Sequence, residues 1–174
     1  ILGIGLAIPK DLERRLQILS AQTSEAEQSK DISFASRVSR ATGFEVFVYN
    51  DGNAGCWGEL MAYPAPRPEH LVYIRVGHFI SSGLITERTL WEGPGGHSGN
   101  LGSMMLTDFN GCRQLVHLIV SLNALERKLI DRNISIPDGS PSTWNWDAIE
   151  SIAAGWIDEA GRALAETIQY MCHG

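Results

Sequence analysis

The apolar run ILGIGLAI at residues 1–8 restricts the fold more than any other segment of this 174-residue chain. Its hydrophobic side chains do not alternate with polar ones, which is typical of a strand buried on both faces of a parallel sheet. Pro9 then indicates where the strand ends. Helices must cover both faces of such a sheet, and strand-like and helix-like patterns alternate along the rest of the chain. We therefore predict an α/β fold.

The segments that follow continue this alternation. Residues 33–42 predict a helix, and Gly43 stands at the position of a C-cap glycine. Residues 45–49 (EVFVY) predict a strand because valine and phenylalanine follow one another closely. The small residues after Asp51 predict a helix at residues 54–62.

A proline-rich segment then predicts a boundary between lobes. Residues 63–70 (YPAPRPEH) carry three prolines, which indicates an extended connector. We accordingly assign residues 1–65 to part of an N-terminal α/β lobe and residues 66–174 to a C-terminal α/β lobe.

Strands and two longer helices are predicted in the second lobe. Residues 71–76 and 83–86 are rich in β-branched and aliphatic side chains and predict strands. Residues 93–102 contain five glycines and predict a loop. Residues 115–130 and 147–171 have apolar side chains at intervals of three or four, which predicts amphipathic helices.

Composition argues against several classes of function. The chain carries 14 Lys and Arg against 20 Asp and Glu, a formal charge of −6, without the basic cluster that DNA binding requires. No apolar run approaches the roughly 18 residues of a membrane span. The three cysteines (Cys56, Cys112 and Cys172) are far apart, which argues against a disulfide framework and indicates a reducing cytoplasm. The chain opens on a strand without an initiator Met, so we expect it to start inside a larger protein.

Three motifs occur in an order that resembles one known family. After the buried strand come NDGNAGCWGE at residues 50–59, LVYIRVGHFISSGLI at 71–85 and GPGGHSGNLGSM at 93–104. Together they resemble the ROK family, named for repressors, open reading frames and kinases, and the resemblance covers roughly residues 1–115. It implies part of an actin-like ATPase fold of the hexokinase, ribonuclease H-like type.

The resemblance assigns a sugar-binding role to Asn50 and Asp51. In family kinases the Asp after the strand is the general base that takes the proton of the attacking sugar hydroxyl, and the preceding Asn binds neighbouring hydroxyls. A carboxylate at a strand end is rigidly held within reach of a hydroxyl, as such catalysis requires. The alternative is a plain Asn-Asp-Gly turn, because all three residue types tolerate turn conformations.

The segment that matches the family's phosphate loop departs from its pattern. Family kinases have Gly-Thr-Gly-x-Gly-Gly-Gly, whereas residues 77–83 read GHFISSG, leaving Gly77, His78 and Gly83 as the remnant. Phosphate binding by backbone N–H groups needs small residues, and Phe79 opposes it. The alternative is a β-hairpin with a bulge and no phosphate-binding role.

The remaining family positions predict neutral sugar contacts and no zinc. Asn100 and Ser103 replace the Glu and His of the family's Glu-x-Gly-His motif, and Gln114 stands where the family has a sugar-binding Glu. Of the family's zinc cysteines only Cys112 remains, so we predict no structural zinc. His97, among glycines, is either a further sugar contact or a solvated loop residue.

We predict a ROK-type transcriptional regulator, with this chain as its sugar-sensing and oligomerisation domain. By resemblance the effector is a sugar or sugar derivative, the assembly is a homodimer, and DNA is contacted only through a segment missing from this chain. The regulator needs no cofactor. One alternative is a glucokinase-like sugar kinase with ATP, Mg²⁺ and Asp51 as general base; another is an assembly protein without a ligand.

Overall fold

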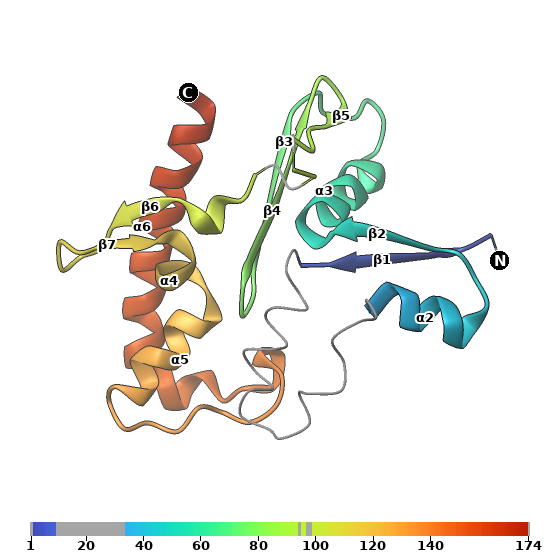
Figure 1. The fold of residues 1–174 in the computed structure, drawn as a ribbon. Helices are drawn as coiled ribbons and strands as arrows, with labels where there is room; N and C mark the ends of the chain where they lie inside the picture. Colours follow the sequence, from blue (N-terminus) through green and yellow to red (C-terminus); the bar gives the residue numbers. More distant parts are fainter. Residues whose placement is uncertain (1, 10–33, 94, 97–98, 174) are drawn as a thin grey trace. The chain divides into compact units, whose positions relative to one another are not determined.

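The structure is a computed structural model, and it describes residues 2–9, 34–93, 95–96 and 99–173 (Figure 1). By packing, the chain divides into two compact units. The first consists of Ile1–Tyr73 and Ser82–Gly99, and the second of Ile74–Ser81 and Asn100–Gly174. The chain therefore passes between the units more than once, and the lobe boundary after residue 65 stays a prediction.

In its described residues, the first unit contains a parallel strand pair, two helices and parts of a three-stranded sheet. Its elements in chain order are β1 (Ile4–Ile8), α2 (Phe34–Thr42), β2 (Val46–Asn50), α3 (Asp51–Ala62), β3 (Leu71–Val76), β4 (Ile80–Thr86) and β5 (Thr89–Leu90). The strands β3 and β4 each continue into the second unit. The alternation of strands and helices confirms the predicted α/β class.

The strands β1 and β2 are parallel, in a register that places Ile4 opposite Val46 and Ile8 opposite Asn50. Helices α2 and α3 both contact this pair and lie on opposite sides of it in Figure 1. Gly43 ends α2 with a φ of 72°, and its N–H donates to the Ser39 carbonyl oxygen at 2.8 Å. The predicted C-cap glycine is therefore confirmed.

The burial predicted for the first strand is not observed. Side chains along β1 alternate between half-buried and exposed, and on β2 Phe47, Val48 and Tyr49 are exposed. The physical reason is that, among the described residues, this sheet has only two strands. A two-stranded sheet leaves much of its apolar surface uncovered.

A small core joins α3 to the sheet β3–β4–β5. Cys56, Leu60 and Ile85 are fully or almost fully buried, with Leu71, Tyr73 and Leu90 packed around them. The antiparallel pair β4–β5 turns at Glu87 and Arg88, both at positive φ, as the twist of a two-residue hairpin requires.

The second unit packs three helices with a short antiparallel strand pair. Its further elements are η2 (Leu101–Ser103), β6 (Met105–Thr107), β7 (Arg113–Leu115), α4 (Val116–Val120), α5 (Leu122–Ile130), η3 (Pro141–Thr143), η4 (Trp146–Ile149) and α6 (Glu150–His173). Buried side chains of α4, α5 and α6 form its core, among them Val116, Val120, Leu125, Leu129 and Ile152. The apolar stripe predicted for residues 147–171 faces this core as far as Leu164, and Ile168 beyond it is exposed.

The helix predicted at residues 115–130 is two helices. Ser121 has an extended backbone, ends α4 and caps α5, where its Oγ accepts a hydrogen bond from the Ala124 N–H at 3.3 Å. A serine at this position favours a helix start over a continuous helix. None of the described helices is both long and apolar enough to cross a lipid bilayer.

Candidate functional site

Asn50 joins a strand to a helix. It is the last residue of β2 and the N-cap of α3, and its Oδ1 accepts hydrogen bonds from the N–H groups of Gly52 and Asn53, each at 3.1 Å. Asparagine is favoured here because it satisfies N–H groups that have no partner within the helix. The helix begins at Asp51, earlier than the predicted residue 54, so the Asn-Asp-Gly segment is not a chain-reversing turn.

Asp51 is half-buried at the first position of α3. It follows the carboxyl end of a parallel strand, the edge at which α/β folds commonly bind ligands. The Asn50 Oδ1 is occupied by the cap, which leaves the Asn50 amide NH₂ as the group able to donate to a ligand oxygen. One carboxylate acceptor and one amide donor are thus placed side by side in sequence, as recognition of a polyhydroxyl compound requires.

The small residues after Asp51 allow α3 to pack closely on the sheet. A Cβ at Gly52 would lie 2.1 Å from the Ser82 carbonyl oxygen, and a Cβ at Gly55 would lie 2.6 Å from the Tyr73 ring. Conversely, a Cβ at Gly83 would lie 2.5 Å from the Cys56 Cβ. Gly83, predicted as a remnant of a phosphate loop, therefore has a packing role within β4.

Two residues that the sequence prediction missed hold the glycine-rich loop. Asn53 is 1% exposed, and its Nδ2 donates to the Gly96 carbonyl oxygen at 3.2 Å. Its Oδ1 has no hydrogen-bond partner in the structure. The Ser82 hydroxyl donates to the Gly99 carbonyl oxygen. The sequence signal for Asn53 is its place in the motif at residues 50–59, three residues after Asn50.

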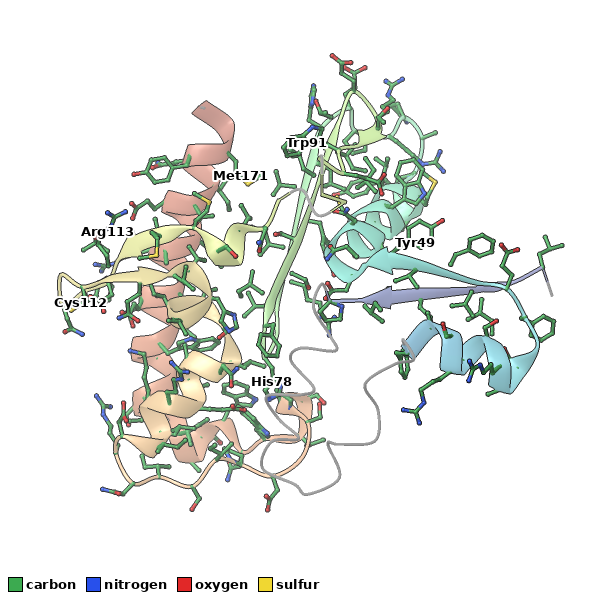
Figure 2. All side chains as sticks on the ribbon, viewed as in Figure 1. Tyr49, His78, Trp91, Cys112, Arg113 and Met171 are labelled. Carbon is green, nitrogen blue, oxygen red and sulfur yellow. The ribbon has the colours of Figure 1, made fainter. Side chains whose placement is uncertain are left out.

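The segment Gly77-His78-Phe79 is engaged by the second unit's own helices. The Gly77 carbonyl oxygen accepts the Leu122 N–H at 2.8 Å, and the His78 Nε2 lies 2.9 Å from the Glu126 Oε1. The Phe79 ring stacks on His117 with centroids 5.1 Å apart and planes within 9°. Figure 2 labels His78 near the turn between β3 and β4. The Gly77 carbonyl oxygen, the His78 ring and the Phe79 ring therefore all contact residues of α4 and α5.

Asn100 and Ser103 bracket the short helix η2. Asn100 is its N-cap and is exposed, without a side-chain capping hydrogen bond, and the Ser103 N–H donates to the Asn100 carbonyl oxygen at 3.1 Å. Ser103 is also exposed. Both side chains are therefore accessible to a ligand.

Gln114 belongs to a network centred on Asp108 in the β6–β7 turn. The Asp108 Oδ1 accepts the N–H groups of Asn110 at 2.9 Å and Cys112 at 2.8 Å, and the Oδ2 accepts the Gln114 amide. These hydrogen bonds, that of Cys112 most of all, lower the pKa of Asp108 against the opposing effect of burial. Gln114 was predicted as a sugar contact. In the structure its amide NH₂ donates a hydrogen bond to the Asp108 carboxylate instead.

The residues of this turn do not fit a structural zinc ion. Cys112 is exposed at the turn (Figure 2). The Asp108 carboxylate accepts the Cys112 N–H and so holds the turn. Within the described part of the chain, no three His, Cys, Asp or Glu side chains are grouped to hold a metal.

The predicted site residues are distributed over both units. Asn50, Asp51 and Gly83 belong to the first, and the second contains the others that are described, Gly77, His78, Asn100, Ser103 and Gln114. His97 lies outside the described residues. Their joint role in sugar binding stays a prediction.

Comparison with known proteins identifies relatives among repressors. The ROK family model matches residues 1–169. The chain is 29% identical over 147 residues to a xylose repressor of Bacillus subtilis, covering 77% of this chain and 37% of the repressor. It is 26% identical over 166 residues to a putative xylose repressor of Caldicellulosiruptor sp., covering 90% of this chain and 40% of that protein. The chain thus spans about two fifths of the length of these relatives.

Solved structures share the fold. A ROK hexokinase from Thermus thermophilus matches 79% of this chain and 48% of its own, with a TM-score of 0.58 and 21% identity. A ROK family protein from Streptococcus pneumoniae, solved in complex with sucrose, matches 95% of this chain and 66% of its own, with a TM-score of 0.58 and 20% identity. These matches confirm the predicted partial actin-like ATPase fold, and the match to the family model over nearly the whole sequence shows that the chain belongs to the ROK family.

Proposed function

We propose that this chain is the sugar-sensing and oligomerisation part of a ROK transcriptional regulator, with a phosphate loop that no longer serves phosphoryl transfer. The observation that carries the proposal is the engagement of Gly77, His78 and Phe79 by Leu122, Glu126 and His117. Phosphoryl transfer depends on positioning and charge stabilisation around the phosphates. In this segment the His78 ring is paired with Glu126, and the bulky Phe79 stands where family kinases have a glycine, so the run of glycine N–H groups that holds a phosphate is interrupted.

The effector in this proposal is a sugar bound by Asn50, Asp51, Asn100 and Ser103, with His97 and Gln114 as further predicted contacts. Carboxylate, amide and hydroxyl groups together supply the donors and acceptors that sugar hydroxyls need. The curated relatives are named xylose repressors, so D-xylose is the first sugar to test. The protein is expected to form a homodimer and to contact DNA through a segment other than this acidic chain, whose formal charge is −6.

Sugar binding regulates DNA binding only if the sugar prefers one of two conformational states. The proposal therefore includes two arrangements of the protein with different sugar affinity. Operator binding and sugar binding must then weaken or strengthen each other by the same factor.

Calorimetric titration of the protein with D-xylose, D-glucose and ATP with Mg²⁺ tests the proposal. We expect saturable heat with one sugar, its loss in Asp51→Ala, and no ATP heat. Asp138→Ala is the matched control, because Asp138 is an exposed loop carboxylate without a role in the proposed site. ATP binding with sugar phosphorylation would instead establish a kinase with Asp51 as general base. No binding heat with any of the sugars or with ATP would favour an assembly protein without a ligand.

A further inference from the structure

Asn53 is a buried residue whose side-chain amide is not explained by the stability of the fold. The residue is 1% exposed, and its Oδ1 has no hydrogen-bond partner in the structure. Burying an acceptor without a donor costs more free energy than one neutral hydrogen bond typically contributes. The reason for an asparagine at this position therefore lies in what its amide holds.

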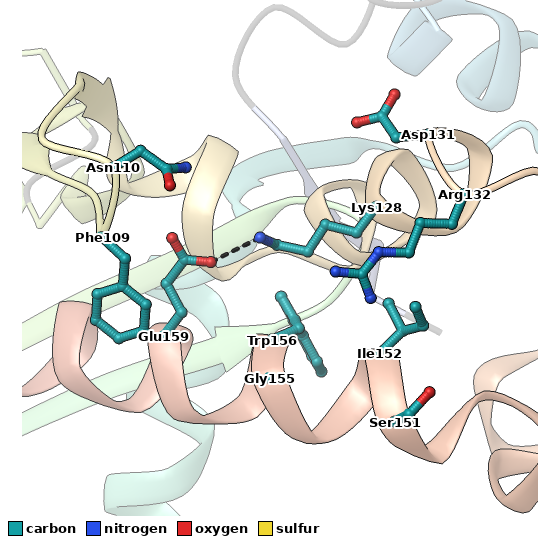
Figure 3. Close-up of a pocket in the computed structure, with 10 residues that line it drawn as sticks. All are labelled: Phe109, Asn110, Lys128, Asp131, Arg132, Ser151, Ile152, Gly155, Trp156 and Glu159. Carbon is teal, nitrogen blue, oxygen red and sulfur yellow. Dashed lines mark ion pairs between the residues drawn. The ribbon is translucent and has the colours of Figure 1, made fainter.

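Other buried polar side chains differ from Asn53 in this respect. The buried Glu159 carboxylate pairs with Lys128, with 2.8 Å between Oε2 and Nζ (Figure 3). Among the fully buried side-chain nitrogen and oxygen atoms of the described residues, only the Asn53 Oδ1 and the Trp156 Nε1 lack a partner. Trp156 also packs a large apolar ring into the core of the second unit, which accounts for its burial. Asn53 has no such apolar surface.

Asn53 links the start of α3 to the glycine-rich loop. Its backbone N–H donates to the Asn50 Oδ1 at 3.1 Å, and its Nδ2 donates to the Gly96 carbonyl oxygen at 3.2 Å. Asp51 lies between Asn50 and Asn53 in the first turn of the helix. Two hydrogen bonds therefore connect a predicted sugar-binding side chain, through Asn53, to the loop.

The loop is held a second time at Gly99. The hydroxyl of the buried Ser82 on β4 donates to the Gly99 carbonyl oxygen. Gly96 and Gly99 have φ of 68° and 67°, and neither has a side chain by which it could be held. The position of the loop at these two residues thus depends on hydrogen bonds to its carbonyl groups, and both donors belong to the first unit.

We propose that Asn53 is a positioning residue for the proposed sugar site. Its Nδ2 hydrogen bond holds the glycine-rich loop against the turn of α3 that contains Asn50 and Asp51, so that this part of the site is already ordered when the sugar arrives. Order that exists before binding does not have to be created on binding, which strengthens affinity. The assignment rests on the proposed function, because it concerns that sugar site.

Asn53→Ala removes this hydrogen bond. We expect faster hydrogen exchange at the Gly96 amide in the ligand-free protein, followed in ¹H–¹⁵N spectra. Calorimetric titration with D-xylose and D-glucose should show affinity for the bound sugar weakened about fivefold, the equilibrium equivalent of one neutral hydrogen bond. Ser82→Ala removes the second hydrogen bond to the loop and should weaken sugar binding in the same way, which keeps the test decisive if Asn53→Ala does not fold.

Thr167→Ala is the matched control. Thr167 is fully buried on α6 in the second unit, and its hydroxyl donates to the Ala163 carbonyl oxygen at 2.7 Å, so this variant also loses one buried hydrogen bond to a backbone carbonyl. It should lower the urea midpoint about as much as Asn53→Ala and leave Gly96 exchange and sugar affinity unchanged.

The outcomes separate the positioning role from the proposed function. Unchanged Gly96 exchange in Asn53→Ala, faster exchange with unchanged sugar affinity, or an equal loss of affinity in Thr167→Ala would each overturn the positioning role alone. Absence of sugar heat in the wild-type protein would instead overturn the proposed function, and the positioning role with it.

Discussion

Gly52 on α3 and Ser82 on β4 are in backbone contact: a Cβ at Gly52 would stand 2.1 Å from the Ser82 carbonyl oxygen and 2.5 Å from its nitrogen. Backbone atoms cannot yield as a flexible side chain does, so any larger residue must displace the helix from the strand. The same helix start contains Asn50 and Asp51. Close packing at Gly52 therefore fixes where the predicted sugar-binding groups lie within the first unit.

Gly52→Ala is expected to destabilise the protein by about 2 kcal/mol, because overpacking costs more than the helix propensity of alanine returns. Gly58→Ala on the same helix is the matched control. A Cβ at Gly58 meets no atom within 4 Å, so that variant should gain up to about 1 kcal/mol. Urea unfolding curves of the two variants measure both effects, and equal midpoints would contradict this account of the contact.

Variants of Asn50 separate its capping role from its proposed ligand role. Asn50→Ala removes both and should cost about 1 kcal/mol of stability together with sugar affinity. Asn50→Ser keeps an oxygen that can accept from the α3 N–H groups but loses the amide donor. It should retain nearly full stability and still bind sugar more weakly. Parallel unfolding and calorimetric titrations decide the matter, and full sugar affinity in Asn50→Ser would limit Asn50 to capping.

Local patterns predicted much of the fold. Helix α2 ends at Gly43, whose φ is positive. The glycine itself is visible in the sequence, so this helix end could be predicted. The strand at residues 45–49 and the apolar stripe of α6 likewise follow from residue type and spacing. The break at Ser121 was missed because apolar spacing continues across it, while the Leu122 N–H bonds instead to the distant Gly77 carbonyl oxygen.

The sites depended on contacts that sequence spacing does not encode. Phe79 in place of a glycine indicated a changed loop, but its stacking on His117 joins residues far apart in the chain. Trp156 was predicted only as a member of an apolar stripe, and no pattern shows that its N–H has no acceptor. Asn53 belonged to the motif at residues 50–59 but was given no role of its own, although it is buried and bonded to the Gly96 carbonyl oxygen. Tertiary packing decided each of these roles.

Cys56 and Cys112 should differ strongly in reactivity toward iodoacetamide. Burial raises the pKa of the Cys56 thiol, and Glu59 raises it further against a hydrogen bond to the Tyr73 backbone. Because the thiolate is the reactive form, Cys56 should stay unmodified in the folded protein near pH 8, whereas the exposed Cys112 reacts. Peptide mass spectrometry measures each site separately. In urea both cysteines should react, and equal labelling in the folded protein would contradict the buried position of Cys56.

Asp108 should make the protein sensitive to acid. Hydrogen bonds from the Cys112 N–H, the Gln114 amide and the Asn110 N–H lower its pKa in the folded state below the ordinary value of about 3.9. A lowered folded-state pKa means that the unfolded chain takes up the proton first. The stabilisation by Asp108 is therefore complete above the unfolded pKa and is lost as pH falls through the folded pKa.

Asp108→Asn removes this titration, so the difference in stability between wild type and variant should shrink as pH falls from 6 toward about 2. Urea unfolding at a series of pH values measures it. Asp138→Asn is the control, since Asp138 is exposed and lies outside this network, and its difference from wild type should change much less with pH. A pH-independent difference for Asp108→Asn would show that the hydrogen bonds to its carboxylate do not hold the turn in solution.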